Sequence, residues 1–236
     1  MSSTVWTPSP LEMMTGMVAV LADTVPSDYD ALFVHASPVR DDRLDARLLD
    51  RVAQAYHSGA DFKVVINGLT EDVCQAKNLA YLGYERWYNI LVQFGVSRDD
   101  ILVLEAAGHT GAEARNLLRL AKEYGWKKLV ISSQPHHQLR CFLQAIALMD
   151  EEGWYPAVYN LPAPGISWHH EMKKPVMTGG TGATGDVLGT LPEHIVREFE
   201  SIEMYAQEPK LVEGRPAFTR NATIPEMLQY MELRRR

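Results

Sequence analysis

The feature of this sequence that most constrains its fold is a regular alternation of short apolar runs with longer segments of helical periodicity. The apolar runs lie at 30–36, 62–66, 101–104, 128–132 and 155–160, and the helical segments at 42–58, 71–94, 110–124 and 136–149. Strands that alternate with helices in this way predict an α/β fold with a mainly parallel sheet, covered by helices on both faces. Right-handed connections then place every strand-to-helix turn at one edge of the sheet, where open sheets bind their ligands.

The composition of the chain changes near residue 160. Residues 1–160 are predicted to form the α/β core together with an N-terminal helix that begins at Ser9 and Pro10. The apolar face of this helix is predicted from the spacing of Leu11, Met14, Val18 and Leu21. Within 161–236, the segment 161–189 is rich in proline, glycine and threonine and predicts a long loop, a common form of lid or binding loop. Helical segments at 191–207 and from 223 onward complete an appendage that is expected to pack on the core.

Charge and cysteine content exclude several classes of protein. Acidic residues outnumber basic ones by 30 to 23, giving a formal net charge of −7 without a basic stripe, so nucleic acid is not expected as a partner. Cys74 and Cys141 lie far apart in predicted helices and are expected to be small buried hydrophobes rather than a disulfide. Because the sequence has no signal-peptide pattern and no membrane anchor, a cytoplasmic protein without a membrane partner is expected, of undetermined oligomeric state.

Polar residues follow four of the predicted strands at the points where those strands end. They are His35, Asn67 with Gly68, Gly108 with His109 and Thr110, and Ser132 with Ser133 and Gln134. Each alone would be an ordinary turn residue. Because a parallel sheet gathers all four turns at one edge, we expect these side chains to form a ligand site there.

Two interpretations of the segment from Thr110 to Glu113 are open. The spacing matches a capping box, in which the Thr110 hydroxyl and the Glu113 carboxylate each accept from the other residue's backbone amide. Alternatively, Glu113 faces the crevice and acts as a base or as an acceptor for ligand hydroxyls.

The segment from Ser133 to Arg140 joins a predicted strand to a helix. A helix N-terminus offers free amides and a partial positive charge to an anion. His137 and Arg140 are three residues apart and share a helix face, so together they can hold a phosphate or a carboxylate. The alternative is that His137 caps the helix and Arg140 pairs with an acidic neighbour.

Other motifs carry less weight. The histidines do not have the spacing of a zinc signature, so no metal is assigned. Residues 180–185 match the letters of a dinucleotide fingerprint but lack the strand before it and the helix after it, which favours a flexible loop. No P-loop and no nucleophile elbow occurs. Trp168 lies in the polar segment beside His169 and is a possible lid residue.

The order of these motifs resembles that of the YdcF/SanA/ElyC-like family, long described as a domain of unknown function. The similarity covers about residues 30–149, with a weaker match at 191–207. It is carried by the strand after Asp30, Asn67-Gly68, Gly83-Tyr84-Glu85-Arg86-Trp87, His109-Thr110-Gly111-Ala112-Glu113-Ala114 and His137-Gln138-Leu139-Arg140. The last two motifs are the most specific.

The resemblance implies a Rossmann-like three-layer α/β/α fold with a pocket at the strand ends. Pocket positions that it implies are Asn67, Gly68, Glu85, Thr110, Glu113, Ser133, His137 and Arg140. It also implies nucleotide-like ligands such as S-adenosylmethionine. The sequence departs from the family pattern at Asn67-Gly68-Leu69, where a Ser-Gly-Gly turn is common, and at His136, where an apolar or aromatic residue is usual. It also lacks the membrane anchor of many relatives, which puts an envelope role in doubt.

These observations lead to one functional hypothesis and two rivals. The leading hypothesis is a hydrolase or transferase that acts on an anionic, nucleotide-like or phosphorylated metabolite, with Glu113 and His137 as the catalytic residues. Arg140 would hold the anion beside Gln134, and Asn67 and Thr110 would orient polar groups. One rival is a non-catalytic module that binds or senses a metabolite such as S-adenosylmethionine. The other is a scaffold in which these polar residues only cap helices.

Overall fold

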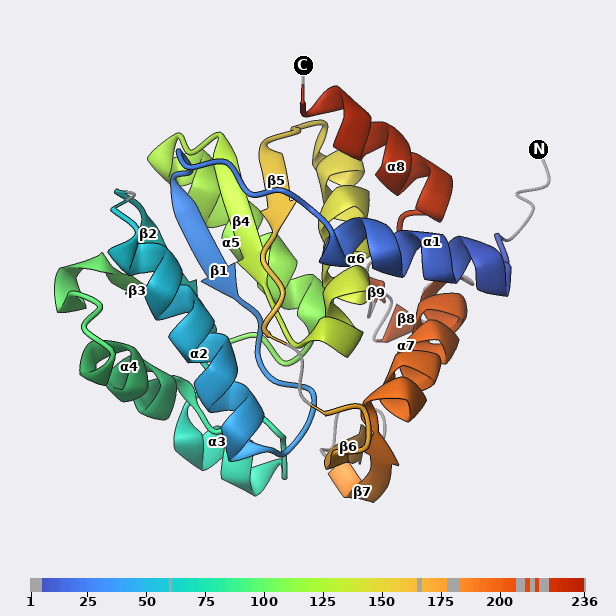
Figure 1. Cartoon of the computed structure of the whole chain (residues 1–236), viewed down its shortest axis with the longest axis horizontal. Helices are drawn as coiled ribbons and strands as arrows, with labels where there is room; N and C mark the ends of the chain where they lie inside the picture. The colour runs from blue at the N-terminus through green and yellow to red at the C-terminus, as the bar shows by residue number, and fades with distance from the viewer. Residues whose placement is uncertain are drawn as a thin grey trace.

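Five parallel strands form the centre of the molecule. The computed structural model describes residues 6–59, 61–164, 167–177, 183–206, 211–212, 215–216 and 221–235. The sheet has the order β3-β2-β1-β4-β5, with all neighbours parallel (Figure 1). Its strands are β1 (Ala31–Val34), β2 (Lys63–Ile66), β3 (Ile101–Val103), β4 (Lys128–Ser132) and β5 (Ala157–Asn160). The predicted α/β class and parallel sheet are therefore confirmed, and the architecture is that of a Rossmann-like three-layer fold.

Helices cover both faces of this sheet. Successive side chains of each strand point to opposite faces, so the sheet contributes to two apolar clusters. Leu32 and Val34 of β1 belong to one apolar cluster, and Ala31 and Phe33 belong to the other. The first cluster is covered by α2 (Asp42–His57), α3 (Glu71–Ala76) and α4 (Tyr84–Gln93). The second is covered by α1 (Pro10–Leu21), α5 (Thr110–Tyr124), α6 (Pro135–Glu152) and α8 (Ile224–Leu233). In the described part of the chain, none of the helices is long and apolar enough to cross a membrane.

The N-terminal helix begins as predicted but turns a different face to the core. Ser9 forms a capping box with Glu12. The buried side of α1 consists of Met13, Gly16, Met17 and Val20, whereas Leu11, Met14, Val18 and Leu21 are exposed. The predicted apolar face was therefore wrong. Both sides of this helix are apolar, so periodicity alone could not select the side that α6 and α8 bury.

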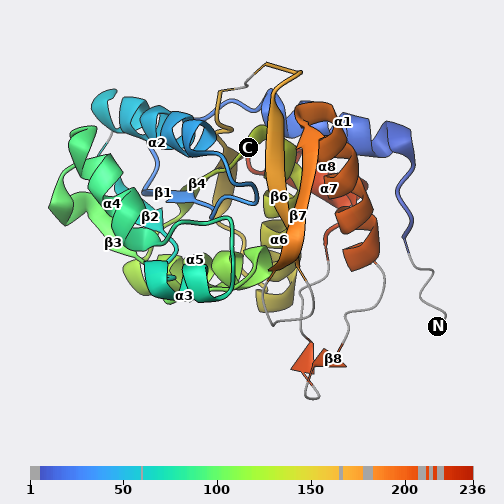
Figure 2. The same cartoon turned by 90° about the horizontal axis from the view of Figure 1, so that it is seen from below.

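The predicted long loop at 161–189 is also wrong over its second half. This segment forms an antiparallel hairpin of β6 (Glu171–Met177) and β7 (Ala183–Thr190), followed by α7 (Leu191–Ala206). Figure 2 shows the two strands side by side next to α7. The proline, glycine and threonine content suggested a loop, but the ribbon accommodates Pro175, which pairs with Asp186 next to a shift in the register of the two strands. Of the dinucleotide-like segment, residues 180–182 lie outside the described residues and 183–185 begin β7.

Packing joins this hairpin to the α/β core. Val39, Leu44, Met172 and Leu191 form a small buried cluster that links the start of α2 to β6 and α7. The Arg40 amide donates to the carbonyl of Lys173 at 2.7 Å. The helix α7 packs on α6. The β6–β7 hairpin and α7 therefore lie against the edge of the sheet at which α2 and α6 begin. The last short pair, β8 (Leu211–Val212) and β9 (Arg215–Pro216), follows α7.

Candidate functional site

Buried polar side chains gather at the carboxyl ends of β1 and β4. His35 follows β1, and its amide donates to the Ser132 carbonyl at the end of β4 at 2.9 Å. The strand that follows β1 in the chain is β2, which pairs with the side of β1 away from β4. The strand that follows β4 is β5, which pairs with the side of β4 away from β1. The chain connections therefore diverge between β1 and β4, which is the position where open α/β sheets bind ligands.

Glu113 of α5 is held as a carboxylate by three donors. Its side chain is almost fully buried and accepts from the Ala36 amide at 3.0 Å, the Asn67 side-chain amide at 2.7 Å and Nδ1 of His35 at 3.0 Å. Burial raises the pKa of Glu113, but the hydrogen bond and charge of His35, with the two amides, lower it overall. The Glu113 carboxylate is thus fixed toward β1 and β2.

The capping-box interpretation of Thr110 and Glu113 is wrong. The N-cap of α5 is His109, whose Nδ1 accepts from the Ala112 amide at 3.2 Å, and Thr110 is the first helical residue. A shift of one residue turns the Glu113 side chain away from the helix start and into the buried cluster. The Glu113 carboxylate lies instead in the buried cluster at the ends of β1 and β2, where it accepts from protein donors.

Asn67 and Gly68 hold the loop after β2 in place. The Asn67 amide nitrogen also donates to the Ala107 carbonyl at 2.8 Å, and its side-chain oxygen accepts from the amides of Ala107 and Leu69. At Gly68, a Cβ atom would lie 2.0 Å from the Leu104 carbonyl oxygen, so this position requires glycine. Because its polar side-chain atoms are engaged, Asn67 acts on the site through Glu113.

His137 lies at the centre of a second buried cluster. Its Nε2 is 3.3 Å from the Thr110 hydroxyl, and its Nδ1 is 3.1 Å from an oxygen of Glu198 on α7. Nη2 of Arg140, which can only donate, also lies 3.1 Å from Nδ1, so Nδ1 stands between an acceptor, Glu198, and a donor. Nε2 is directed at Thr110. Three side chains from three helices thus form a continuous hydroxyl–imidazole–carboxylate series.

Two further cations contact Glu198. Nε of Arg140 donates to it at 2.7 Å, and Nζ of Lys174, from β6, donates at 2.5 Å. Burial raises the pKa of Glu198, but the charges of Arg140 and His137 hold it well below its usual range. Arg140 and His137 therefore share a helix face as predicted, and in this structure the anion between them is a side chain of the protein.

The two clusters meet through His35, His137 and Cys141. The imidazole rings of His35 and His137 are 6.5 Å apart and nearly perpendicular. Burial raises the pKa of the Cys141 thiol, but the charges of His137 and His35 lower it to about 6. For His35, burial lowers the pKa, and the charges of Cys141 and Glu113 raise it to about 10. Cys141 is buried as predicted, but its environment is ionic rather than purely apolar.

Ser133 and Gln134 form the turn between β4 and α6. Both side chains are fully buried, and among the described residues neither the Ser133 hydroxyl nor the Gln134 amide has a hydrogen-bond partner. Gln134 is the N-cap residue of α6 but makes no side-chain capping bond. Unpaired buried polar atoms are costly, and these two side chains therefore hold hydrogen-bonding capacity that the described protein atoms do not use.

The remaining predicted site residues lie elsewhere. Glu85 on α4 is half-buried and accepts from the Glu71 amide at 3.0 Å, so it caps α3. In the described ranges, no hydrogen bond or ion pair joins it to the buried clusters. Trp168 is 62% exposed, so most of its side chain faces solvent. The described part of the chain holds no group of three or more metal-ligating side chains in position for an ion.

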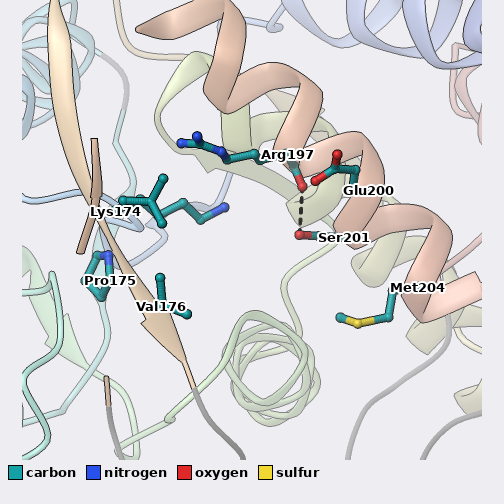
Figure 3. Close-up of a pocket in the computed structure, with 8 residues that line it drawn as sticks. Lys174, Pro175, Val176, Arg197, Glu200, Ser201 and Met204 are labelled. Carbon is teal, nitrogen blue, oxygen red and sulfur yellow. Dashed lines mark hydrogen bonds between the residues drawn. The ribbon is translucent and has the colours of Figure 1, made fainter. Parts of the chain in front are cut away.

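A cavity of about 300 Å³ lies beside the second cluster, between the β6–β7 hairpin and α7 (Figure 3). Lys174 belongs to both, because it lines the cavity and bonds Glu198. The other lining residues include Val176, Val187, Arg197, Glu200 and Met204. This cavity is separate from the pocket that was predicted at the ends of β1, β2, β3 and β4, because none of the residues named there lines it.

Sequence reasoning missed Glu198, Lys174 and the ionic role of Cys141. Glu198 had a recognisable signal, because it occupies the apolar side of α7 between Leu191 and Ile202, where a lone carboxylate needs a partner. Lys174 lies in the segment that was predicted to be a loop. Comparison with protein-family models and with curated proteins finds no match to this sequence. The functional argument therefore rests on the geometry of these clusters.

Proposed function

We propose that this protein is an enzyme that hydrolyses a small anionic metabolite or transfers a group from it. The observation that carries the proposal is the series Thr110–His137–Glu198, with separations of 3.3 Å and 3.1 Å. A hydroxyl, an imidazole and a carboxylate in this order form the arrangement that activates a nucleophile in many unrelated folds.

The proposed chemistry uses Nε2 of His137 as the base and places a proton on its Nδ1. Nε2 of His137 would take the proton of the Thr110 hydroxyl, or of a water held beside it, as that oxygen attacks a carbon or phosphorus atom. The same nitrogen would then give the proton to the departing group. Glu198 would keep Nδ1 protonated and stabilise the imidazolium. Burial lowers the pKa of His137, but the charges of Cys141 and Glu198 raise it overall, so we expect turnover to increase as the pH rises and the free base forms.

His35 and Glu113 would form a second acid–base pair. Nδ1 of His35 bonds Glu113, and the same ring interacts with the Cys141 thiol. Burial lowers the pKa of His35, but Cys141 together with Glu113 raises it overall. A carboxylate that already accepts from three donors is a poor base, so Glu113 is proposed to orient His35 rather than to accept a proton from the substrate. Burying two such ion pairs is a weak source of stability, which favours a functional reason for both.

The turn before α6 would receive the anionic part of the substrate. Ser133 and Gln134 offer unpaired donors and acceptors there, and the helix N-terminus favours negative charge. Nucleotides and phosphorylated sugars are therefore proposed ligands. S-adenosylmethionine, a nucleotide-like molecule, has polar groups that these side chains can bind. Two free, buried cysteines fit a cytoplasmic location.

The test begins with thermal unfolding in the presence of nucleotides, sugar phosphates and S-adenosylmethionine. Each stabilising compound is then incubated with the protein and analysed by mass spectrometry for a product. Thr110→Val, His137→Asn and Glu198→Gln should each lower turnover at least about 100-fold. His169→Asn, which changes an exposed histidine, should leave turnover unchanged.

The second proposal is a module that binds a metabolite without converting it. It is favoured by the burial of the proposed catalytic side chains. Thr110 is 7% exposed and His137 is 2% exposed. A ligand that stabilises the protein and is recovered unchanged after long incubation would support this module and contradict the enzyme. Full turnover in His137→Asn would contradict the proposed series of three residues.

A further inference from the structure

The cavity between the β6–β7 hairpin and α7 combines positive charge with an apolar wall. Lys174 from β6 and Arg197 from α7 line it, together with the apolar side chains Val176, Val187 and Met204. In Figure 3, the charged ends of Lys174 and Arg197 lie toward one end of the cavity, and Val176 and Met204 lie toward the other. Its volume of about 300 Å³ is at the lower end of the range for small-molecule pockets, which is about 300–1,000 Å³.

The charged groups of the cavity retain capacity for a ligand. Nζ of Lys174 donates to Glu198 at 2.5 Å, and an ammonium group has two further hydrogens. Nη1 of Arg197 donates to the Leu188 carbonyl at 3.4 Å, a long bond that uses one of five donors. Glu200 is the acidic residue among the lining side chains. The ions that line the cavity thus comprise two cations and one anion.

The ion pair of Lys174 does not cancel this excess of positive charge. Glu198, which accepts from Lys174, also accepts from Arg140 at 2.7 Å and lies 3.1 Å from His137. The charge of Arg197 also interacts with Glu193, one turn earlier on α7. The cavity lining itself holds two cations, Lys174 and Arg197, against the one carboxylate of Glu200.

We propose that this cavity binds a small amphiphilic anion, a monocarboxylate with a short unbranched apolar chain. Its carboxylate would accept from Lys174 and Arg197, and its chain would lie against Val176, Val187 and Met204. This site goes beyond the proposed reaction, because it is separate from Ser133 and Gln134 and needs no turnover to be occupied.

The test is calorimetric titration of the full chain with hexanoate, with acetate and 1-hexanol as the separated head group and tail. Hexanoate should bind, and both controls should bind at least about tenfold more weakly, which corresponds to about 1.4 kcal/mol. Lys174→Met should weaken hexanoate binding about tenfold. Lys173→Met is the matched control, because Lys173 is on the same strand, is exposed and does not line the cavity.

A second pair of variants tests the apolar wall. Met204→Glu should abolish hexanoate binding, and Val196→Glu, at an exposed position of α7 outside the cavity lining, should not. If Met204→Glu fails to fold, Met204→Trp fills the same space without a charge and should also prevent binding. Absence of hexanoate binding to the native chain, equal binding of 1-hexanol, or unchanged affinity in Lys174→Met would each overturn the proposal. Because the assay measures binding alone, failure of the proposed reaction would leave its result intact.

Discussion

Glu198 lies 3.1 Å from Nδ1 of His137, although 61 positions separate the two residues. This contact joins α7 to the start of α6 and brings the C-terminal third of the chain into the buried site. It also distinguishes Glu198 from the other acidic residues of α7, Glu193, Glu200 and Glu203, which are exposed.

The first prediction concerns the stability that Glu198 contributes. Glu198→Gln would leave Arg140 and Lys174 beside a neutral amide in a buried position. Breaking a buried ion pair from one side typically destabilises a protein by about 3–5 kcal/mol. Urea unfolding should show a loss of this size for Glu198→Gln and a change below about 0.5 kcal/mol for Glu200→Gln on the same helix. Equal effects of the two substitutions would contradict the ionic role of Glu198.

The second prediction concerns the pH dependence of Glu113. Because the folded protein lowers the pKa of this carboxyl below 4.5, Glu113 contributes stability that is complete above about pH 4.5 and is lost as the pH falls through the folded-state pKa. The difference in unfolding free energy between the native chain and Glu113→Gln should therefore be constant near neutral pH and shrink below about pH 4.5. Glu105→Gln, at an exposed position, is the control. A difference that grows on acidification would show that the folded protein raises this pKa.

The third prediction separates two glycines that sequence analysis placed in adjacent strand-end turns. In Gly68→Ala the new Cβ would lie 2.0 Å from the Leu104 carbonyl oxygen, whereas at Gly108 it would meet no atom within 4 Å. Because that oxygen belongs to the backbone, Gly68→Ala should destabilise the protein by about 1–3 kcal/mol or more. Gly108→Ala should change the unfolding free energy by less than about 0.5 kcal/mol. Similar melting temperatures for both variants would show that the loops after β2 and β3 can separate.

The fourth prediction concerns Gln134, whose buried amide has no partner in the described structure. Gln134→Leu replaces this amide by an apolar group of similar size. Without ligand, the substitution should stabilise the protein by about 1–3 kcal/mol, because it removes unpaired polar atoms from the interior. Each kcal/mol corresponds to about 2–4 °C in melting temperature for a chain of this size.

The same variant should lose the thermal stabilisation that the native protein gains from its ligand. A variant that is less stable than the native chain and still responds to ligand would contradict both roles of Gln134. Asn67 offers no equivalent test, because its amide and carbonyl are bonded to Ala107, Leu69 and Glu113.

Some of the candidate site could be predicted because it depends on the positions of strand ends. His35, Asn67, Ser133 and Gln134 each follow a buried strand, and a parallel sheet must bring such residues to one edge. His137 and Arg140 were expected to share a helix face, and the structure places both on Glu198. Their proposed catalytic and binding roles remain predictions.

Local sequence could not resolve other parts. Whether Glu113 closes a capping box or enters the core depends on a one-residue shift in the start of α5, and His109 rather than Thr110 caps that helix. Packing against α6 and α8 determines which face of α1 is buried, because the sequence of α1 is apolar on both sides. The β6–β7 hairpin forms through pairing between two strands whose individual composition resembles a loop.

The sequence by itself determined the α/β class, the number and direction of the central strands and the edge at which polar groups collect. These properties follow from hydrophobic periodicity and from the handedness of connections, which are local. The tertiary structure decided which carboxylates meet which histidines. Glu113 reaches His35 across 78 positions, and Glu198 reaches His137 across 61. Such pairings depend on the packing of distant helices, because a buried charge takes its partner from whatever the fold places beside it.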